Sequence, residues 1–312
     1  MGGFLDKKIL AALFITALVT LAGCGEEIST TPPFTLNSAV TSDPSLFDVG
    51  ESETGLSTSA LDDGFSILVS ATEEARCYSW YRRFTSTGAI TIAQISVEAL
   101  TAEVVVTRSN VRGLLNVRMT SASTTSPEAF KQDFKRYIIL NKIEGVWRIK
   151  KVTQGVSRSL QSSTTPYNSV GSDITIDSVS IYDVTGGVTF DVTGGPTAEG
   201  PWIDYDNIPH ITHGNTMQIT VVAEQIGNAS GPVPYVFIWP DLDGTGGFSR
   251  HQLPWNNDAL FSYTYTFTIP ADETRGRKKM TIGVFAARTL TSEEATLGAY
   301  DLTSWHIPYE VK

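Results

Sequence analysis

The sequence predicts an α+β domain, built on a curved antiparallel sheet with an N-terminal helix, followed by an all-β sandwich domain. Two patterns lead to this prediction. Between residues 60 and 154 one candidate helix precedes several β-branched runs, and between residues 173 and 312 short strand-like runs alternate with turn residues. The length agrees with two domains, since 312 residues with 41% hydrophobic residues can form two cores.

The N-terminus has the pattern of an exported protein. Lys7 and Lys8 precede an apolar run over residues 9–21, which is shorter than the roughly 20 residues that a membrane-spanning helix needs. The run ends in Leu-Ala-Gly-Cys at residues 21–24, which resembles the lipobox of bacterial lipoprotein precursors. The resemblance implies that residues 1–23 are a signal peptide, and that Cys24 becomes the lipid-bearing N-terminus.

The same resemblance implies a location. Gly25 follows the cysteine, whereas an aspartate there favours retention in the inner membrane, so the outer membrane is expected if the organism has two membranes. Several acyl chains on one residue hold a protein durably, because each buried CH₂ contributes about 0.8 kcal/mol. Residues 24–59 are rich in Ser, Thr, Pro and acidic residues, and we expect them to form a flexible tether at the cell envelope.

Cysteine content and charge limit the other partners. If Cys24 carries lipid, Cys77 has no partner for an intramolecular disulfide, and we expect it to be a small buried apolar side chain. Residues 76–158 hold 14 basic and 5 acidic residues, a net charge of +9, and residues 173–312 hold 7 basic and 17 acidic residues, a net charge of −10. The basic residues form no nucleic-acid recognition motif, so no nucleic-acid partner is expected.

The first domain, residues 60–154, is expected to open with a helix near residues 70–82, and the β-branched and aromatic content of this stretch leaves a strand as the alternative. Ser70 or Thr72 can cap it, and acidic residues follow in its first turn. The strand-like runs that follow are residues 89–100, 102–108 and 114–119.

A hairpin closes this domain. Residues 136–142 and 145–152 are expected to pair about a turn at residues 143–145, with Trp147 and Ile149 on one face. This hairpin resembles the closing hairpin of NTF2-like domains, in which a strongly curved sheet forms a cone. The resemblance implies either an isomerase or dehydratase pocket or a non-catalytic binding role. The segment has no His and a single Asp, which favours the non-catalytic role.

A polar segment, residues 155–172, is expected to link this domain to the second, residues 173–312. In residues 261–269 aromatic residues and Ile alternate with Ser and Thr, which is typical of a strand with one buried face. This strand is one of seven predicted: residues 174–181, 188–192, 216–224, 233–239, 261–269, 279–288 and 303–311. Their number and spacing resemble immunoglobulin-like sandwiches, without the inter-sheet disulfide of antibody domains.

The candidate ligand residues lie in loops of the second domain, and we expect them to gather at one end of the sandwich. They are Asp204, Asp206, Asp241, Asp243 and Trp255. Asp241 and Asp243 have the spacing of the first two ligands of a calcium-binding loop. The twelfth position of that loop, which normally supplies a bidentate carboxylate, is Gln252, so an ordinary turn is the alternative to calcium. Trp255 could stack on a glycan.

Histidines offer a second kind of site. His210 and His213, with His251 or His306, could bind zinc if the fold gathers them, and a hydrogen-bonding loop is the alternative. No common catalytic motif is present, so no catalytic residue is predicted.

The sequence therefore predicts an envelope lipoprotein, non-enzymatic, that presents a binding surface to an envelope protein or a glycan. The alternative is a small-molecule isomerase or hydrolase that uses an NTF2-like pocket, or a glycan-active surface protein.

Overall fold

The computed structural model describes residues 35–43, 46, 78–119, 126–160, 174–195, 197, 200–225, 233–240, 250–258, 261–271, 273, 275–286, 289 and 300–312. The segment Phe34–Lys312 forms one compact unit. Its described residues lie mostly in antiparallel strands, together with the short helix α1 (Leu36–Thr41). The predicted lipid site Cys24, Cys77, and the loop residues Asp241 and Asp243 lie outside the described residues.

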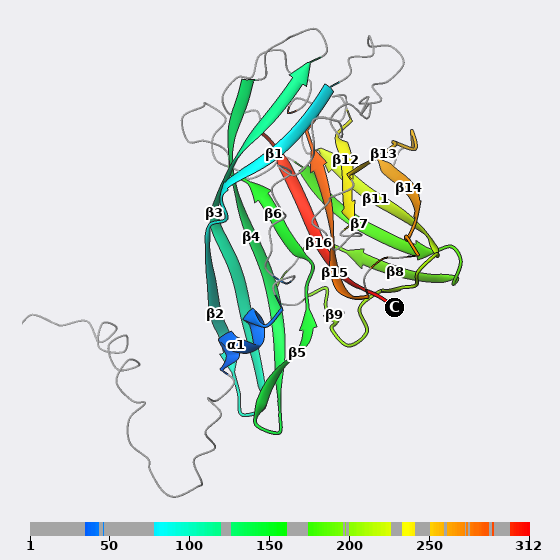
Figure 1. The fold of residues 1–312 in the computed structure, drawn as a ribbon. Helices are drawn as coiled ribbons and strands as arrows, with labels where there is room; N and C mark the ends of the chain where they lie inside the picture. Colours follow the sequence, from blue (N-terminus) through cyan, green and yellow to red (C-terminus); the bar gives the residue numbers. More distant parts are fainter. Residues whose placement is uncertain are drawn as a thin grey trace, which may run out of the picture. The chain divides into compact units, whose positions relative to one another are not determined.

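The larger of two sheets is curled and has twelve strands, of which eight follow the order β1-β3-β4-β6-β16-β15-β12-β13 (Figure 1). Its strands are β1 (Tyr78–Ser86), β2 (Ala89–Val97), β3 (Thr101–Met119), β4 (Ser126–Ile143), β5 (Val146–Val152), β6 (Gly155–Ser159), β9 (Ile203–Asp204), β10 (His210–Ile211), β12 (Tyr235–Pro240), β13 (His251–Leu253), β15 (Gly276–Phe285) and β16 (Leu302–Val311). All neighbours pair antiparallel except β10 and β16.

Two long strands, β3 and β4, form the centre of the first half of this sheet. β1 and β2 pair with successive parts of β3, and β6 and β5 pair with successive parts of β4. A register shift between Arg108 and Val111 interrupts the β3–β4 pairing, and such irregularities bend a sheet. The predicted hairpin is confirmed, because β4 and β5 join through Glu144 and Gly145, both with positive φ.

The predicted α+β class is wrong in its helical part. Tyr78–Ser86, which includes the end of the helix expected at residues 70–82, is strand β1. Trp80 and Arg82 are buried on the same face of this strand, which is the alternation of a strand. Trp80 and Arg82 pack against aromatic side chains of β12 and β15, distant strands of the same curled sheet, and that burial decides the structure over local helix propensity.

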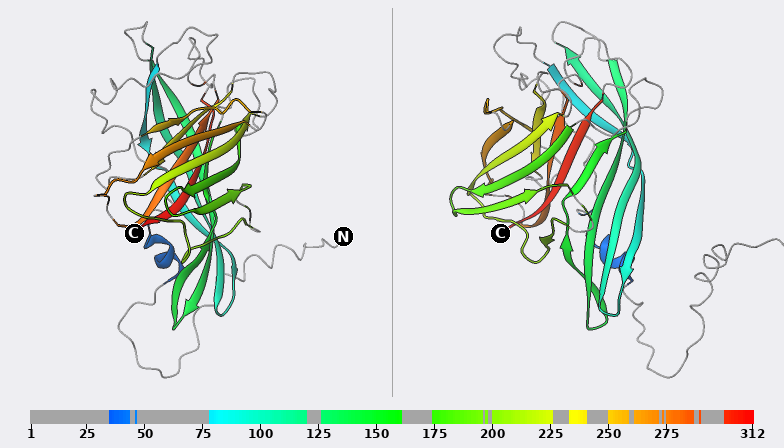
Figure 2. Two further views of the ribbon diagram at one scale, coloured as in Figure 1. Left: turned by 90° about the vertical axis from the view of Figure 1, so that its right-hand side faces the viewer. Right: turned by 180° about the vertical axis from the view of Figure 1, so that it is seen from behind.

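The smaller sheet has four antiparallel strands in the order β14-β11-β7-β8 (Figure 2). They are β7 (Ile174–Asp183), β8 (Val188–Thr193), β11 (Thr216–Gln225) and β14 (Ser262–Thr268). All seven strands predicted between residues 174 and 311 are present, in one or the other sheet. Tyr263 and Phe267 are buried as the alternation in residues 261–269 predicted.

The segments on either side of the predicted linker share one sheet. Gly155–Ser159, expected at the start of that linker, is instead strand β6, which pairs with β4 on one side and β16 on the other. The expected tether also contains ordered structure, because α1 lies within residues 24–59 and buries Leu36 and Val40. Buried side chains of α1, β3, β4 and of both sheets after residue 174 belong to one apolar cluster.

Candidate functional site

A hollow of about 350 Å³ lies where four distant segments of the chain meet. The segments are α1 with its C-terminal cap, the first half of β5, and the turn after β9 together with the start of β15. Its lining is mainly polar and aromatic: Ser42, Asp43, Trp147, Arg148, Tyr205, Asp206 and Arg277, beside Ala39, Val146 and Ile149. The mixture of both charges with two aromatic rings makes this hollow the candidate binding site in the described residues.

Helix α1 forms one wall of the hollow. The side chain of Thr35 caps it by accepting a hydrogen bond from the backbone N–H of Ser38 at 3.2 Å. Leu36, Ala39 and Val40 are buried, so one face of this short helix enters the core. The apolar contacts therefore hold Asp43, just after the helix, at the edge of the hollow.

Tyr205 forms the floor and is 3% exposed. Its hydroxyl donates a hydrogen bond to the carboxylate of Asp43. The guanidinium of Arg277 lies 4.0 Å from the centre of the Tyr205 ring and donates to the Tyr205 carbonyl oxygen at 3.4 Å. Burial raises the pKa of Tyr205, so the phenol stays protonated and remains a hydrogen-bond donor at neutral pH.

Behind the floor lies Arg136, which is fully buried on β4. Its guanidinium donates to the carbonyl oxygens of Leu46, at 2.8 Å, and His306. Burial lowers the pKa of Arg136 to about 10, while the carboxylate of Asp43 opposes this shift. The guanidinium therefore stays charged at neutral pH and joins the N-terminal arm, residues 35–46, to the sheet.

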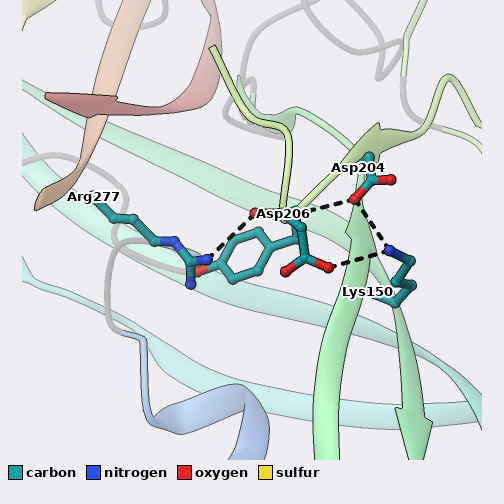
Figure 3. A network of polar contacts seen from close by, with 5 residues as sticks. Lys150, Asp204, Asp206 and Arg277 are labelled. Carbon is teal, nitrogen blue, oxygen red and sulfur yellow. Dashed lines mark hydrogen bonds and ion pairs between the residues drawn. The ribbon is translucent and has the colours of Figure 1, made fainter. Parts of the chain in front are cut away.

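The rim carries the one predicted site pair that the structure brings together. Figure 3 shows Asp204 and Asp206 on either side of the Lys150 ammonium, with Arg277 nearby. Lys150 Nζ lies 3.5 Å from Asp204 Oδ1 and 3.2 Å from Asp206 Oδ2. The pKa of Asp204 is lowered mainly because its carboxylate accepts a hydrogen bond from the backbone N–H of Asp206. The pKa of Lys150 is raised mainly because its ammonium donates a hydrogen bond to the Asp206 carboxylate.

This arrangement bears on the calcium hypothesis. The ammonium of Lys150 occupies the position between the two carboxylates that a cation would take. Within the ranges that the structure describes, no group of three or more His, Cys, Asp or Glu could hold a metal ion. Asp204 and Asp206 are therefore arranged as an ion-pair rim around a lysine.

Trp255 lies at the other end of the β15 strand from this rim. It bridges to Tyr263, whose hydroxyl donates to the Pro234 carbonyl oxygen at 2.9 Å. The next residue, Tyr235, pairs with Phe285 at the end of β15, whereas Arg277 at its start touches Tyr205. At about 3.3 Å per residue this separates the two places by roughly 26 Å, so the expected convergence with Asp204 and Asp206 is not seen.

His251 and His306 lie apart from His210 and His213, which both contact the C-terminal residues 310–312. His210 Nδ1 pairs with Glu310 at 3.0 Å, and His251 Nδ1 lies 2.9 Å from the hydroxyl of Tyr265. His306 is buried between Ser157, at 2.9 Å from Nε2, and Thr281, at 3.1 Å from Nδ1. Although Ser157 and His306 are adjacent, both are buried, which leaves no room for a substrate.

Sequence reasoning missed Asp43, Tyr205 and Arg277. Asp43 fell in the expected tether, and Arg277 precedes an apolar strand run by several residues. The one sequence signal was Tyr205 itself, which stands between the two aspartates that were selected.

No protein-family model matches this chain, and no curated protein matches it. In the part of the chain that the structure describes, no helix is long and apolar enough to cross a membrane.

Proposed function

We propose that this chain is a membrane-anchored envelope lipoprotein, non-enzymatic, which binds a ligand or partner through the hollow floored by Tyr205. The lipobox at residues 21–24 supports the anchor, and its physical consequence is a folded unit held at a lipid surface by Cys24. The same proposal places the protein in the outer membrane if the organism has two membranes, because the residue after the cysteine is Gly25 and not an aspartate.

The main support for a binding role over an enzymatic one is that side chains fill the concave face of the curled sheet. Its inward residues Val104, Phe134, Ile138 and Leu140 are at most 1% exposed and pack in one cluster with Leu46 of the N-terminal arm. An enzyme that used this cone would need an open pocket with polar groups at its base. The polar hollow lies at the rim, between β5 and α1, which favours surface recognition.

The two finer fold assignments belong to this proposal. β11 and β14 lie with β7 in one sheet, and β16, β15, β12 and β13 follow one another in the other, an order that supports an immunoglobulin-like sandwich. The curved meander of β3, β4 and their partners supports the NTF2-like resemblance. The helix packed against that meander, α1, has six residues, which is short for such a domain.

The hollow can be tested by capture from envelope extracts. Residues 24–312, which contain the whole compact unit, serve as bait, and bound proteins and glycans are identified by mass spectrometry. The Trp147→Ala/Arg148→Ala variant removes two side chains of the lining, and Trp255→Ala is the control at the far end of the sheet. We expect the lining variant to lose a captured species that the control retains. Equal capture by all three proteins would contradict a role for the hollow.

A further inference from the structure

The end of the molecule that carries α1 also carries an exposed apolar surface, here named the twin-hairpin tip. It is made by the β2–β3 and β4–β5 hairpins, which are linked by a hydrogen bond from the Lys142 N–H to the Leu100 carbonyl oxygen at 2.8 Å. Leu100 is 66% exposed and Ile143 is 49% exposed. Ile95 and Val97, near the end of β2, are also exposed, so the strand that leads into the first loop adds two large apolar side chains.

Clustered exposed apolar side chains mark places where a protein meets another apolar surface. The length of chain before α1 indicates which surface this is. Thr35, which caps α1, stands eleven positions after Cys24, and at about 3.5 Å per position this length of chain reaches at most roughly 40 Å. Because α1 and the start of β5 line the same hollow, the chain enters the folded unit at the end that carries the tip.

We propose that the twin-hairpin tip inserts into the surface of the phospholipid bilayer that holds the anchor. This inference rests on the proposed lipid anchor at Cys24. Trp147 and Lys142 stand just above the tip, with the ammonium of Lys142 5.7 Å from the centre of the Trp147 ring. Tryptophan and lysine of this kind suit the headgroup layer, since each has an apolar body and a polar end.

The charges of the tip nearly cancel, so the proposed contact rests on its apolar side chains. Glu98 and Glu144 stand in the two loops, against Lys142 and Arg148. The Glu98 carboxylate accepts a hydrogen bond from the Thr101 hydroxyl at 3.2 Å. With two charges of each sign, the tip gains little from anionic lipid, and its binding should depend weakly on salt.

The direct test places a dye at the tip of the anchored protein. Leu100→Cys, in a Cys77→Ser background, is labelled with a polarity-sensitive dye and reconstituted through its lipidated N-terminus into phosphatidylcholine–phosphatidylethanolamine vesicles. The matched control is Val188→Cys on β8, since Val188 is 65% exposed and Leu100 is 66% exposed. Spin-labelled lipid should quench the dye at residue 100 strongly and leave the dye at residue 188 unchanged.

A second measurement uses residues 24–312 without the lipid, floated with the same vesicles. Leu100→Ser/Ile143→Ser should weaken binding about tenfold or more, because each buried apolar side chain contributes strongly to partition. Val184→Ser/Val188→Ser should bind as the unchanged protein does. The proposal would be overturned if the two variants bound the vesicles equally. It would also be overturned if the dye at residue 100 were shielded by a second copy of the chain and were not quenched by spin-labelled lipid.

The two proposals fail in different ways. The acyl content of Cys24 is measured on the same samples by mass. An acylated protein whose dye at residue 100 is not quenched overturns the membrane contact and leaves the anchor in place. A mature protein without acyl chains on Cys24 overturns both.

Discussion

Two buried side chains, Arg136 and His306, lie where the β4, β6 and β16 strands meet. Arg136 donates to the main-chain carbonyl of His306, and the His306 ring packs edge-on against Phe134 at 5.5 Å between centres. Burial, with Lys279, Arg136 and Arg82 nearby, holds the pKa of His306 well below its ordinary value of 6.5. The ring is therefore neutral in the folded protein, and its two nitrogens face Ser157 and Thr281.

This neutral histidine predicts a pH dependence of stability. In the unfolded chain the His306 imidazole takes up a proton near pH 6.5, whereas in the folded chain it stays neutral. The contribution of His306 to the free energy of unfolding is therefore complete above pH 6.5 and is lost as the pH falls below that value. The slope from this group approaches about 1.4 kcal/mol per pH unit. Urea unfolding of His306→Gln between pH 7 and 5 should show a shallower slope. The exposed His210→Gln is the control, and an equal slope in all three proteins would show that His306 does not cause the effect.

At the scale of elements, β6 is the strand that joins the two halves of the larger sheet. It begins at Gly155, where a Cβ would lie 2.4 Å from the Phe134 ring and 3.0 Å from a guanidinium nitrogen of Arg136. The close approach of backbone to these side chains requires glycine.

Gly155→Ala should therefore destabilise the protein by about 1–3 kcal/mol, the usual cost of overpacking a well-filled core. Gly195→Ala is the matched control, because nothing lies within 4 Å of its added Cβ and its φ is not positive. Thermal unfolding measures both. A stability for Gly155→Ala equal to that of the control would mean that Phe134 moves aside at no cost.

The sequence predicted elements best where one face of a strand is buried by its own alternation. The strand predicted at residues 261–269 is such a case, and it is present as β14. The other six strands predicted after residue 174 are also present, whereas β9, β10 and β13, which have only two or three residues each, were not predicted. Strand β1 was missed because its burial depends on distant partners: the guanidinium of Arg82 lies 4.8 Å from the Trp239 ring, and that of Arg250 lies 3.8 Å from the Trp80 ring. Local spacing holds no trace of such contacts.

The candidate site was predicted in part for the same reason. Asp204 and Asp206 stand two residues apart, so their pairing about one loop can be seen in the sequence. Asp43 and Arg277 meet Tyr205 through contacts that span more than 160 residues of sequence on one side and more than 70 on the other. Long-range pairings of this kind cannot be deduced from local pattern.

At the scale of the whole molecule, the shared sheet and core predict one cooperative unit. Residues 60–154 and 173–312, expected as two domains, are joined by the pairing of β6 with β4 and β16. Tryptophan fluorescence and far-ultraviolet circular dichroism should therefore report a single, coincident urea transition. Two separated transitions, or a stable fragment ending near residue 160 after limited proteolysis, would show that the halves fold independently.

The N-terminal arm links this unit to its proposed anchor. Because residues 35–46 are docked through Leu36, Val40 and the Leu46 carbonyl, the chain available between Cys24 and the folded unit is short. If Cys24 carries lipid as proposed, this short length limits how far the folded unit can stand from the membrane.

The intact mass of the mature protein, purified from membranes of its own host or of a bacterial expression host, tests the central claim most directly. The account predicts a chain that begins at Cys24 and carries a diacylglycerol on its thiol, and a Cys24→Ser variant that is either released from the membrane or left unprocessed. A mature chain that begins at another residue, or a membrane-bound chain with no added lipid mass, would contradict the lipoprotein assignment.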